Sequence, residues 1–179
     1  MKLVKSDIRE ISENAFSYIV VFAMFAYGVG KIVQFKNAVD LSKTVEKMTG
    51  MELMWAFYGH SATYVYILGC LEIIGGLLML IKTTRLIGCL LVSTIVINII
   101  LQDIFYNVNV GALRAAILYQ ILILAILWFN REKLLASSKV LLNRNIKGIS
   151  KKDTLIKLLL SFLLFVILRI VEFYLTIKL

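Results

Sequence analysis

Five blocks of apolar residues, separated by short polar segments, dominate the hydrophobic pattern of this chain. Each block has about 20 residues, the length at which a helix rising about 1.5 Å per residue crosses a hydrocarbon core about 30 Å thick. Because lipid offers no hydrogen-bond partners, the backbone of such a segment has to satisfy its own polar groups as a helix. The pattern therefore predicts an all-α integral membrane protein. The predicted spans are residues 14–35, 62–82, 85–106, 112–130 and 154–177.

The connections between the spans predict how the helices are arranged. Residues 82–85 join the second span to the third, and residues 107–111 join the third to the fourth. Connections this short place successive helices side by side and antiparallel, as in an up-and-down bundle. We therefore expect an antiparallel four-helix transmembrane bundle in residues 1–133, a basic amphipathic cytoplasmic linker in 134–153 and a fifth transmembrane helix in 154–179.

The connection between the first two spans is long enough to have structure of its own. In residues 37–49, apolar side chains recur at helical spacing on one face and charged side chains lie opposite. An aromatic-rich run follows in residues 51–58, a composition typical of the headgroup region. We expect an amphipathic helix that lies on the outer mouth of the bundle. A loop that only packs on its own bundle is the alternative.

Composition and charge agree with a membrane protein and set its orientation. Hydrophobic residues make up 60% of the chain, above the roughly 45–50% of soluble domains. The net charge of +9 does not indicate nucleic-acid binding, because the basic residues lie between the apolar blocks rather than on one face. With the N-terminus inside, twelve lysines and arginines lie on the inner side and five on the outer side. The positive-inside rule then predicts a cytoplasmic N-terminus and an outer C-terminus.

The reactive side chains favour no catalytic or metal site. The two cysteines, Cys70 and Cys89, both lie within apolar blocks and have no metal-ligand spacing. His60 is the one histidine of the chain, which excludes a bis-histidine haem and a Cys/His zinc site. No nucleophile stands near a base in the sequence, and no phosphate-binding loop is present. We expect neither catalytic residues nor metal ligands.

Polar residues inside the predicted spans are the informative candidates, because a charge at the centre of a bilayer costs at least about 2.5–3.5 kcal/mol. Counted along each helix, these residues fall in the outer half of the bilayer. They predict a polar cavity that opens toward the outer surface. The candidates from the spans are Lys31, Glu72, Asn98, Gln102, Asp103 and Gln120, and Tyr27, Tyr64, Tyr119 and His60 are placed to line or close the cavity.

Glu72 is the first candidate for ligand binding, and Lys31 is its expected partner by depth. Two interpretations of this pair stay open: an ion pair that only fixes helix packing, or a carboxylate that binds a proton or ligand. Two interpretations are also open for Asn98 and Gln120, interhelical hydrogen bonding and ligand contact, and hydrogen bonding is favoured.

Three sequence features point to a known family. They are Gly30-Lys31 near the end of the first span, Glu72 followed by Gly75-Gly76 in the second, and the basic turn Thr84-Arg85 before the third. Over about residues 14–133 this combination resembles the DoxX-like family of small polytopic membrane proteins. The resemblance implies a four-helix bundle in a bacterial cytoplasmic (inner) membrane, with Lys31 and Glu72 as the polar pair of the family. It also implies quinone as a possible ligand, since some relatives accompany quinone-linked oxidoreductases.

The fifth span is absent from that family pattern and suggests a helix that docks on another membrane protein. Arg169 and Glu172 are spaced i,i+3 and can pair on one face of this helix. We expect them to contact the partner.

Three functions follow from these observations. The leading hypothesis is a non-catalytic accessory subunit that binds a lipophilic small molecule, a lipid or a partner helix in the outer-half cavity. The second is a membrane subunit of a quinone-linked oxidoreductase. The third is a small-solute or proton-coupled carrier, against which the apolar inner half of the spans argues.

Overall fold

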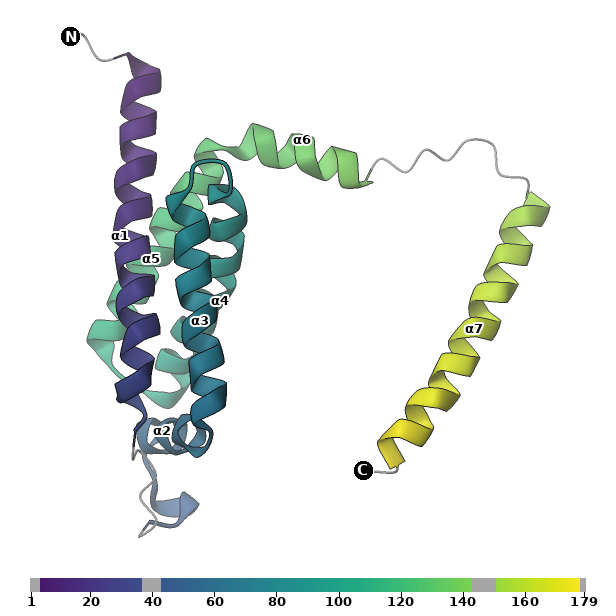
Figure 1. Cartoon of the computed structure of the whole chain (residues 1–179), viewed down its shortest axis with the longest axis horizontal. Coiled ribbons are helices and arrows are strands. Elements are labelled where there is room, and N and C mark those ends of the chain that lie inside the picture. Colours follow the sequence, from purple (N-terminus) through teal and green to yellow (C-terminus); the bar gives the residue numbers. More distant parts are fainter. Residues whose placement is uncertain (1–3, 37–42, 143–150, 178–179) are drawn as a thin grey trace. The chain divides into compact units, whose positions relative to one another are not determined.

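The computed structural model describes residues 4–36, 43–142 and 151–177, and the described residues contain helices and no strand. The elements are α1 (Lys5–Gln34), the 3-10 turn η1 (Val45–Lys47), α2 (Gly50–His60), α3 (Ala62–Leu80), α4 (Arg85–Tyr106), α5 (Val110–Phe129), α6 (Arg131–Leu142) and α7 (Lys151–Ile177), as shown in Figure 1. Among the described residues, α1, α3, α4, α5 and α7 are long and apolar enough to cross a membrane. This confirms the predicted all-α membrane fold. The chain divides into two compact units, Met1–Leu135 and Ala136–Leu179.

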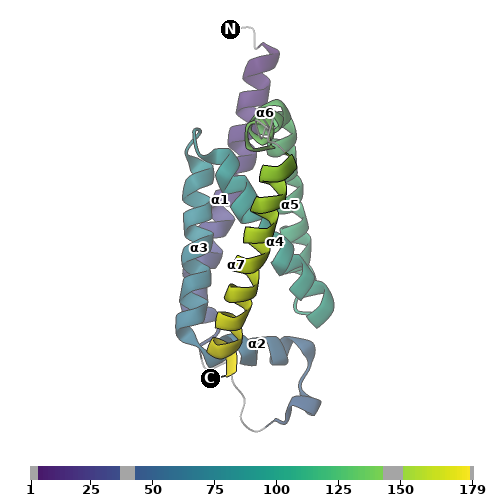
Figure 2. The ribbon, with the colours of Figure 1, turned by 90° about the vertical axis from the view of Figure 1, so that its right-hand side faces the viewer.

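Four of the spanning helices form a bundle within the first unit. Helix α3 packs antiparallel to α4 and α4 to α5, and α1 packs against α3 and α5. The short helix α2 lies across one end of the bundle and packs on α3 and α4 (Figures 1 and 2). We call this end the α2 end, and the opposite end, where residues 81–84 join α3 to α4, the turn end.

Apolar side chains fill the bundle from the turn end to its middle. Within a lipid solvent such packing contributes through dispersion contacts between closely fitting side chains rather than through release of water. Three of these residues, Met24, Val96 and Ala116, also line a cavity that lies toward the α2 end. The buried core comprises Val20, Val21, Ala23, Met24, Met79, Cys89, Val92, Val96, Ala116, Ile123 and Ile126.

The turn end is held by hydrogen bonds to the last carbonyls of α3, which have no partner within the helix itself. Ser17 Oγ of α1 and Arg85 Nε of α4 both donate to the Met79 carbonyl oxygen, at 2.8 and 3.1 Å. Thr84 Oγ1 donates to the Leu78 carbonyl oxygen at 2.9 Å. Arg85 is buried here, and its positive charge lies against the negative end of the α3 dipole.

Helices α1 and α3 cross at a pair of glycines. A Cβ atom added to Gly69 would lie 2.6 Å from the carbonyl oxygen of Gly28, and one added to Gly28 would lie 2.7 Å from that of Gly69. Both distances are shorter than a real Cβ contact, so the two backbones approach as closely as only glycine allows.

This crossing gives a stability prediction. Gly69→Ala is expected to lower the free energy of unfolding by about 1–3 kcal/mol, because the backbone of α1 has to move away. Gly30→Ala is the matched control in the same helix pair, since a Cβ atom at Gly30 meets nothing within 4 Å. There the better helix propensity of alanine should leave stability unchanged or raise it by up to about 1 kcal/mol. Unfolding in mixed micelles measures both, and equal effects would contradict the close crossing.

The start of α1 differs from the sequence prediction. Helix α1 begins at Lys5, well before residue 14, because Asp7 accepts a hydrogen bond from the Val4 backbone N–H and caps the helix. Arg9 Nε lies 3.0 Å from Glu13 Oε1, and this ion pair stabilises the polar first turns of α1. Hydropathy locates the part of a helix that lies in lipid, and this helix continues beyond that part.

The amphipathic helix predicted for residues 37–49 is wrong in its described part, 43–49, where only η1 is helical; residues 37–42 lie outside the described residues. The helix at this end is α2, over the aromatic-rich run. It begins at Gly50 because Thr49 and Glu52 form a capping box, in which each side chain accepts a hydrogen bond from the other residue's backbone N–H.

Candidate functional site

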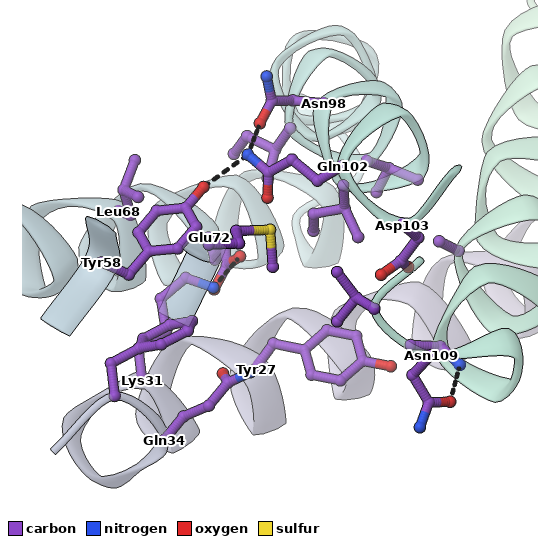
Figure 3. A pocket seen from close by; sticks show the side chains of 18 of the residues that line it. Tyr27, Lys31, Gln34, Tyr58, Leu68, Glu72, Asn98, Gln102, Asp103 and Asn109 are labelled. Atoms are coloured by element: carbon purple, nitrogen blue, oxygen red, sulfur yellow. Dashed lines mark hydrogen bonds and ion pairs between the residues drawn. The ribbon is translucent and has the colours of Figure 1, made fainter. Parts of the chain in front are cut away.

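A cavity of about 520 Å³ lies between α1, α2, α3, α4 and α5, near the α2 end of the bundle. Figure 3 shows its polar side chains, which come from helices far apart in the sequence and converge on one space. Most of the remaining wall is apolar or aromatic, including Leu68, Leu71 and Trp55. The polar lining consists of Tyr27, Lys31, Gln34, Tyr58, Glu72, Thr94, Asn98, Gln102, Asp103, Asn109 and Tyr119.

An ion pair between α1 and α3 lies on the wall of this cavity. Lys31 Nζ is 2.9 Å from Glu72 Oε1, and the Glu72 side chain is almost completely buried. The second carboxylate oxygen, Oε2, is buried and has no hydrogen-bond partner among the described residues. Burying a charge is costly unless hydrogen bonds satisfy it fully, so this carboxylate is incompletely stabilised by the residues around it.

A second polar group connects α2 to α4. Gln102 Nε2 donates to Tyr58 Oη at 2.5 Å and to Asn98 Oδ1 at 2.6 Å. Burial raises the pKa of the Tyr58 phenol, and the hydrogen bond from Gln102 opposes that rise. The phenol therefore stays protonated at neutral pH and keeps its own proton for donation.

Asp103 is the second buried carboxylate of the cavity. Its side chain is only 7% exposed, and Oδ2 has no hydrogen-bond partner among the described residues. It extends from α4 into the cavity, whereas Glu72 extends from α3 (Figure 3). Tyr27 and Tyr119 face each other nearby, with ring centroids 6.4 Å apart.

An aromatic cluster holds α2 over the cavity. Phe35 at the end of α1 packs between two rings of α2, with centroid distances of 5.1 Å to Trp55 and 4.8 Å to Tyr58. Met54 and Val65 complete this buried cluster. Aromatic rings therefore cover the cavity on the side of α2.

Of the ten candidates named from the sequence, seven line the cavity: Tyr27, Lys31, Glu72, Asn98, Gln102, Asp103 and Tyr119. The hydrogen bond of Asn98 stays within α4, so the expected interhelical bond is wrong for this residue. Its neighbour one turn on, Gln102, makes the bond between helices instead.

The other three candidates, Gln120, His60 and Tyr64, do not line the cavity. Gln120 donates to Ser93 Oγ at 2.8 Å and so joins α5 to α4, as the hydrogen-bonding interpretation predicts. It follows Tyr119 directly, and a step of one residue turns a side chain by about 100° around a helix. His60 is exposed at the end of α2. Tyr64 stacks on Tyr58 and also lies outside the lining.

The sequence analysis ranked Glu72 above the other carboxylate of the cavity, Asp103, and did not name Tyr58. Asp103 satisfies the same criterion as Glu72, a carboxylate inside an apolar span, and was named as a candidate on that basis. Tyr58 gave no such signal, because an aromatic residue near a span is expected at the headgroup level in any case.

In the second unit, Arg169 Nη1 lies 2.6 Å from Glu172 Oε2, which confirms the predicted i,i+3 pair on α7. Both side chains are exposed within that unit. Their role as a partner contact stays a prediction.

Comparison with known proteins places the chain near one curated relative. No protein-family model matches the sequence, and no solved structure matches it. The chain is similar to the protein YwoB of Bacillus subtilis (strain 168), described as uncharacterized, with 29% identity over 133 residues. The match covers 73% of this chain and 84% of YwoB. The resemblance to the DoxX-like family stays a prediction.

The capping box of α2 makes the helix over the cavity sensitive to acid. Hydrogen bonds from Lys43 and Thr49 hold the pKa of Glu52 at about 2, below its ordinary value of 4.5. A depressed pKa in the folded state means that the stabilisation from Glu52 is present above pH 4.5 and is lost as the pH falls toward 2.

We expect the fluorescence of Trp55 to change over this pH range in a Trp128→Phe background, since Trp128 is the other tryptophan of the chain. Glu52→Gln should remove most of the change. Glu46→Gln, which alters an exposed acid in η1, should keep it. An identical acid transition in Glu52→Gln would contradict the role of the capping box.

Proposed function

We propose that this protein is a non-catalytic membrane accessory subunit that binds a lipophilic small molecule in the cavity between α1 and α5. The observation that supports the proposal most directly is Glu72, a residue of the cavity wall whose carboxylate oxygen Oε2 is buried and has no hydrogen-bond partner among the described residues.

The size and composition of the cavity favour a lipophilic small molecule over a highly polar solute. About 520 Å³ lies within the roughly 300–1,000 Å³ range of ligand pockets. Such pockets combine apolar walls with a few placed polar groups that orient the ligand. Here the apolar wall takes the lipophilic part, and the ion pair, Gln102 and Asp103 receive the polar head.

The proposed orientation follows the positive-inside rule. With the N-terminus in the cytoplasm, the turn end faces the cytoplasm and the α2 end faces the outer surface. The cavity then lies in the outer half of the bilayer, and the apolar core closes the inner half. This closure argues against a carrier, which needs a path through both halves. A bacterial cytoplasmic (inner) membrane is part of the proposal, with the C-terminus periplasmic or extracellular.

A subunit of a quinone-linked oxidoreductase is the second candidate. Lys31 and the hydroxyls of Tyr27 and Tyr119 border the cavity, and each can donate a hydrogen bond to a quinone carbonyl. A quinone recovered by extraction of the purified protein would support this candidate.

A partner membrane protein is proposed from α7. The Arg169–Glu172 pair lies within an apolar helix whose described side chains are exposed in their own unit. An ion pair that faces lipid is unfavourable, so contact with the polar surface of another membrane helix would stabilise it.

Native mass spectrometry of the detergent-extracted protein, with lipid and quinone extraction from the same sample, tests the binding proposal. We expect one small molecule per chain in the wild type and in Glu46→Gln, and its loss in Glu72→Gln, where an amide replaces the carboxylate. Equal occupancy in wild type and Glu72→Gln would contradict a binding role for Glu72. An empty protein that carries a second polypeptide would favour an assembly role.

A further inference from the structure

The charges of the cavity restrict the chemistry of its ligand. Two carboxylates, Glu72 and Asp103, line it, and Lys31 is the one cationic residue in its described lining. Lys31 pairs with Glu72 at 2.9 Å, and no described residue forms an ion pair with Asp103. With both acids ionised, the cavity therefore carries a net negative charge.

The unsatisfied polar atoms point to the same chemistry. Glu72 Oε2 and Asp103 Oδ2 are buried, both belong to residues more than nine-tenths buried, and both lack a hydrogen-bond partner among the described residues. When its carboxylate is ionised, each of these oxygens is an acceptor, and a ligand that brings donors to the carboxylate can stabilise it. Figure 3 shows the two carboxylates on α3 and α4, directed into the same space.

We infer that the ligand is a cationic amphiphile with an ammonium head that carries N–H donors and an apolar tail. This inference rests on the proposed function and names the ligand class of that site. The ammonium head balances the second carboxylate and donates to the free oxygens. A carboxylate or phosphate head would bring like charge to a cavity that is already negative.

The aromatic wall supports a cationic head as well. Tyr27, Trp55, Tyr58 and Tyr119 line the cavity, and a cation within about 6 Å of a ring face is attracted by the ring quadrupole. The tail is then placed against Leu68, Leu71 and the other apolar residues of the lining, where its burial needs no polar partner.

Three probes with the same tail separate head chemistry from lipophilicity: dodecylammonium, dodecanol and dodecanoate. The full chain in phosphatidylcholine nanodiscs is titrated with each at neutral pH, and binding is followed by native mass spectrometry. We expect dodecylammonium to bind at least about tenfold more tightly than dodecanol, and dodecanoate to bind most weakly.

Asp103→Asn provides the matched test of the carboxylate. We expect the affinity for dodecylammonium to fall about tenfold to a hundredfold, because a charged hydrogen bond is lost, and the affinity for dodecanol to stay unchanged. Unchanged dodecanol binding also shows that the variant keeps its cavity. Glu46→Gln removes one negative charge outside the cavity and should leave both affinities unchanged.

The selectivity of the unmodified chain decides the inference even if Asp103→Asn does not fold. Binding of dodecanol or dodecanoate as tight as that of dodecylammonium would overturn the cationic ligand and leave the proposed cavity function in place. Failure of all three probes to bind would contradict the proposed function together with the inference.

Discussion

Replacing Lys31 with methionine is expected to lower the free energy of unfolding of the bundle by about 3–5 kcal/mol. The substitution leaves the Glu72 carboxylate buried, only 1% exposed, without its counter-charge. Removal of one partner from a buried pair costs more than the pair itself contributes, because the remaining charge stays desolvated. Reversible unfolding in mixed micelles measures the loss.

The double variant Lys31→Met/Glu72→Gln removes both charges and should recover much of that loss, so that the two single effects do not add. Lys82→Met is the exposed control. Lys82 pairs with Glu10 at the surface of the first unit, where such a pair contributes only about 0–1 kcal/mol. A Lys31→Met variant no less stable than Lys82→Met would show that the Glu72 carboxylate is not held as a buried charge.

Ala112→Phe is expected to weaken binding of the cavity ligand about tenfold to a hundredfold, since forcing extra volume into an occupied site costs about 1–3 kcal/mol. Ala112 lies on α5 and lines the cavity, so the phenyl ring occupies the space of the ligand without changing any charged group. In the empty protein the same ring fills a void, and stability should stay unchanged or rise by up to about 2 kcal/mol.

Ala26→Phe is the matched control for this variant. Ala26 is exposed on α1 and does not line the cavity, so the added ring should face lipid and leave binding unchanged. Dodecylammonium titration of both variants in nanodiscs measures the effect. If Ala112→Phe binds as tightly as Ala26→Phe, the ligand lies elsewhere on the protein.

The spans were predictable because the membrane imposes one physical rule on every segment that crosses it. A run of about 20 apolar residues has to be helical, whatever its neighbours are. Tight connections then fix which helices are neighbours, and the depth of each residue follows from the helical rise. These three steps were enough to pair Lys31 with Glu72 across 41 positions of sequence.

The rotation of each helix about its axis was not predictable in the same way. Tyr119 and Gln120 are adjacent and lie at the same depth, yet only Tyr119 lines the cavity. A helix that is apolar around most of its circumference, such as α5, has no marked face that tells which side turns inward. The position of α2 was missed for another reason, since the capping signal of Thr49 and Glu52 was present in the sequence and was not used.

The order of the two charged residues along the chain has a consequence for biosynthesis. A ribosome delivers α1 to the membrane before α3, because a chain is made from its N-terminus. Lys31 is therefore in the membrane before Glu72 leaves the ribosomal exit tunnel. Until α3 is inserted, the long side chain of Lys31 can extend toward water. The span that carries Glu72 therefore enters a membrane in which its counter-ion is already anchored, and this carboxylate does not have to stay unpaired in lipid during assembly.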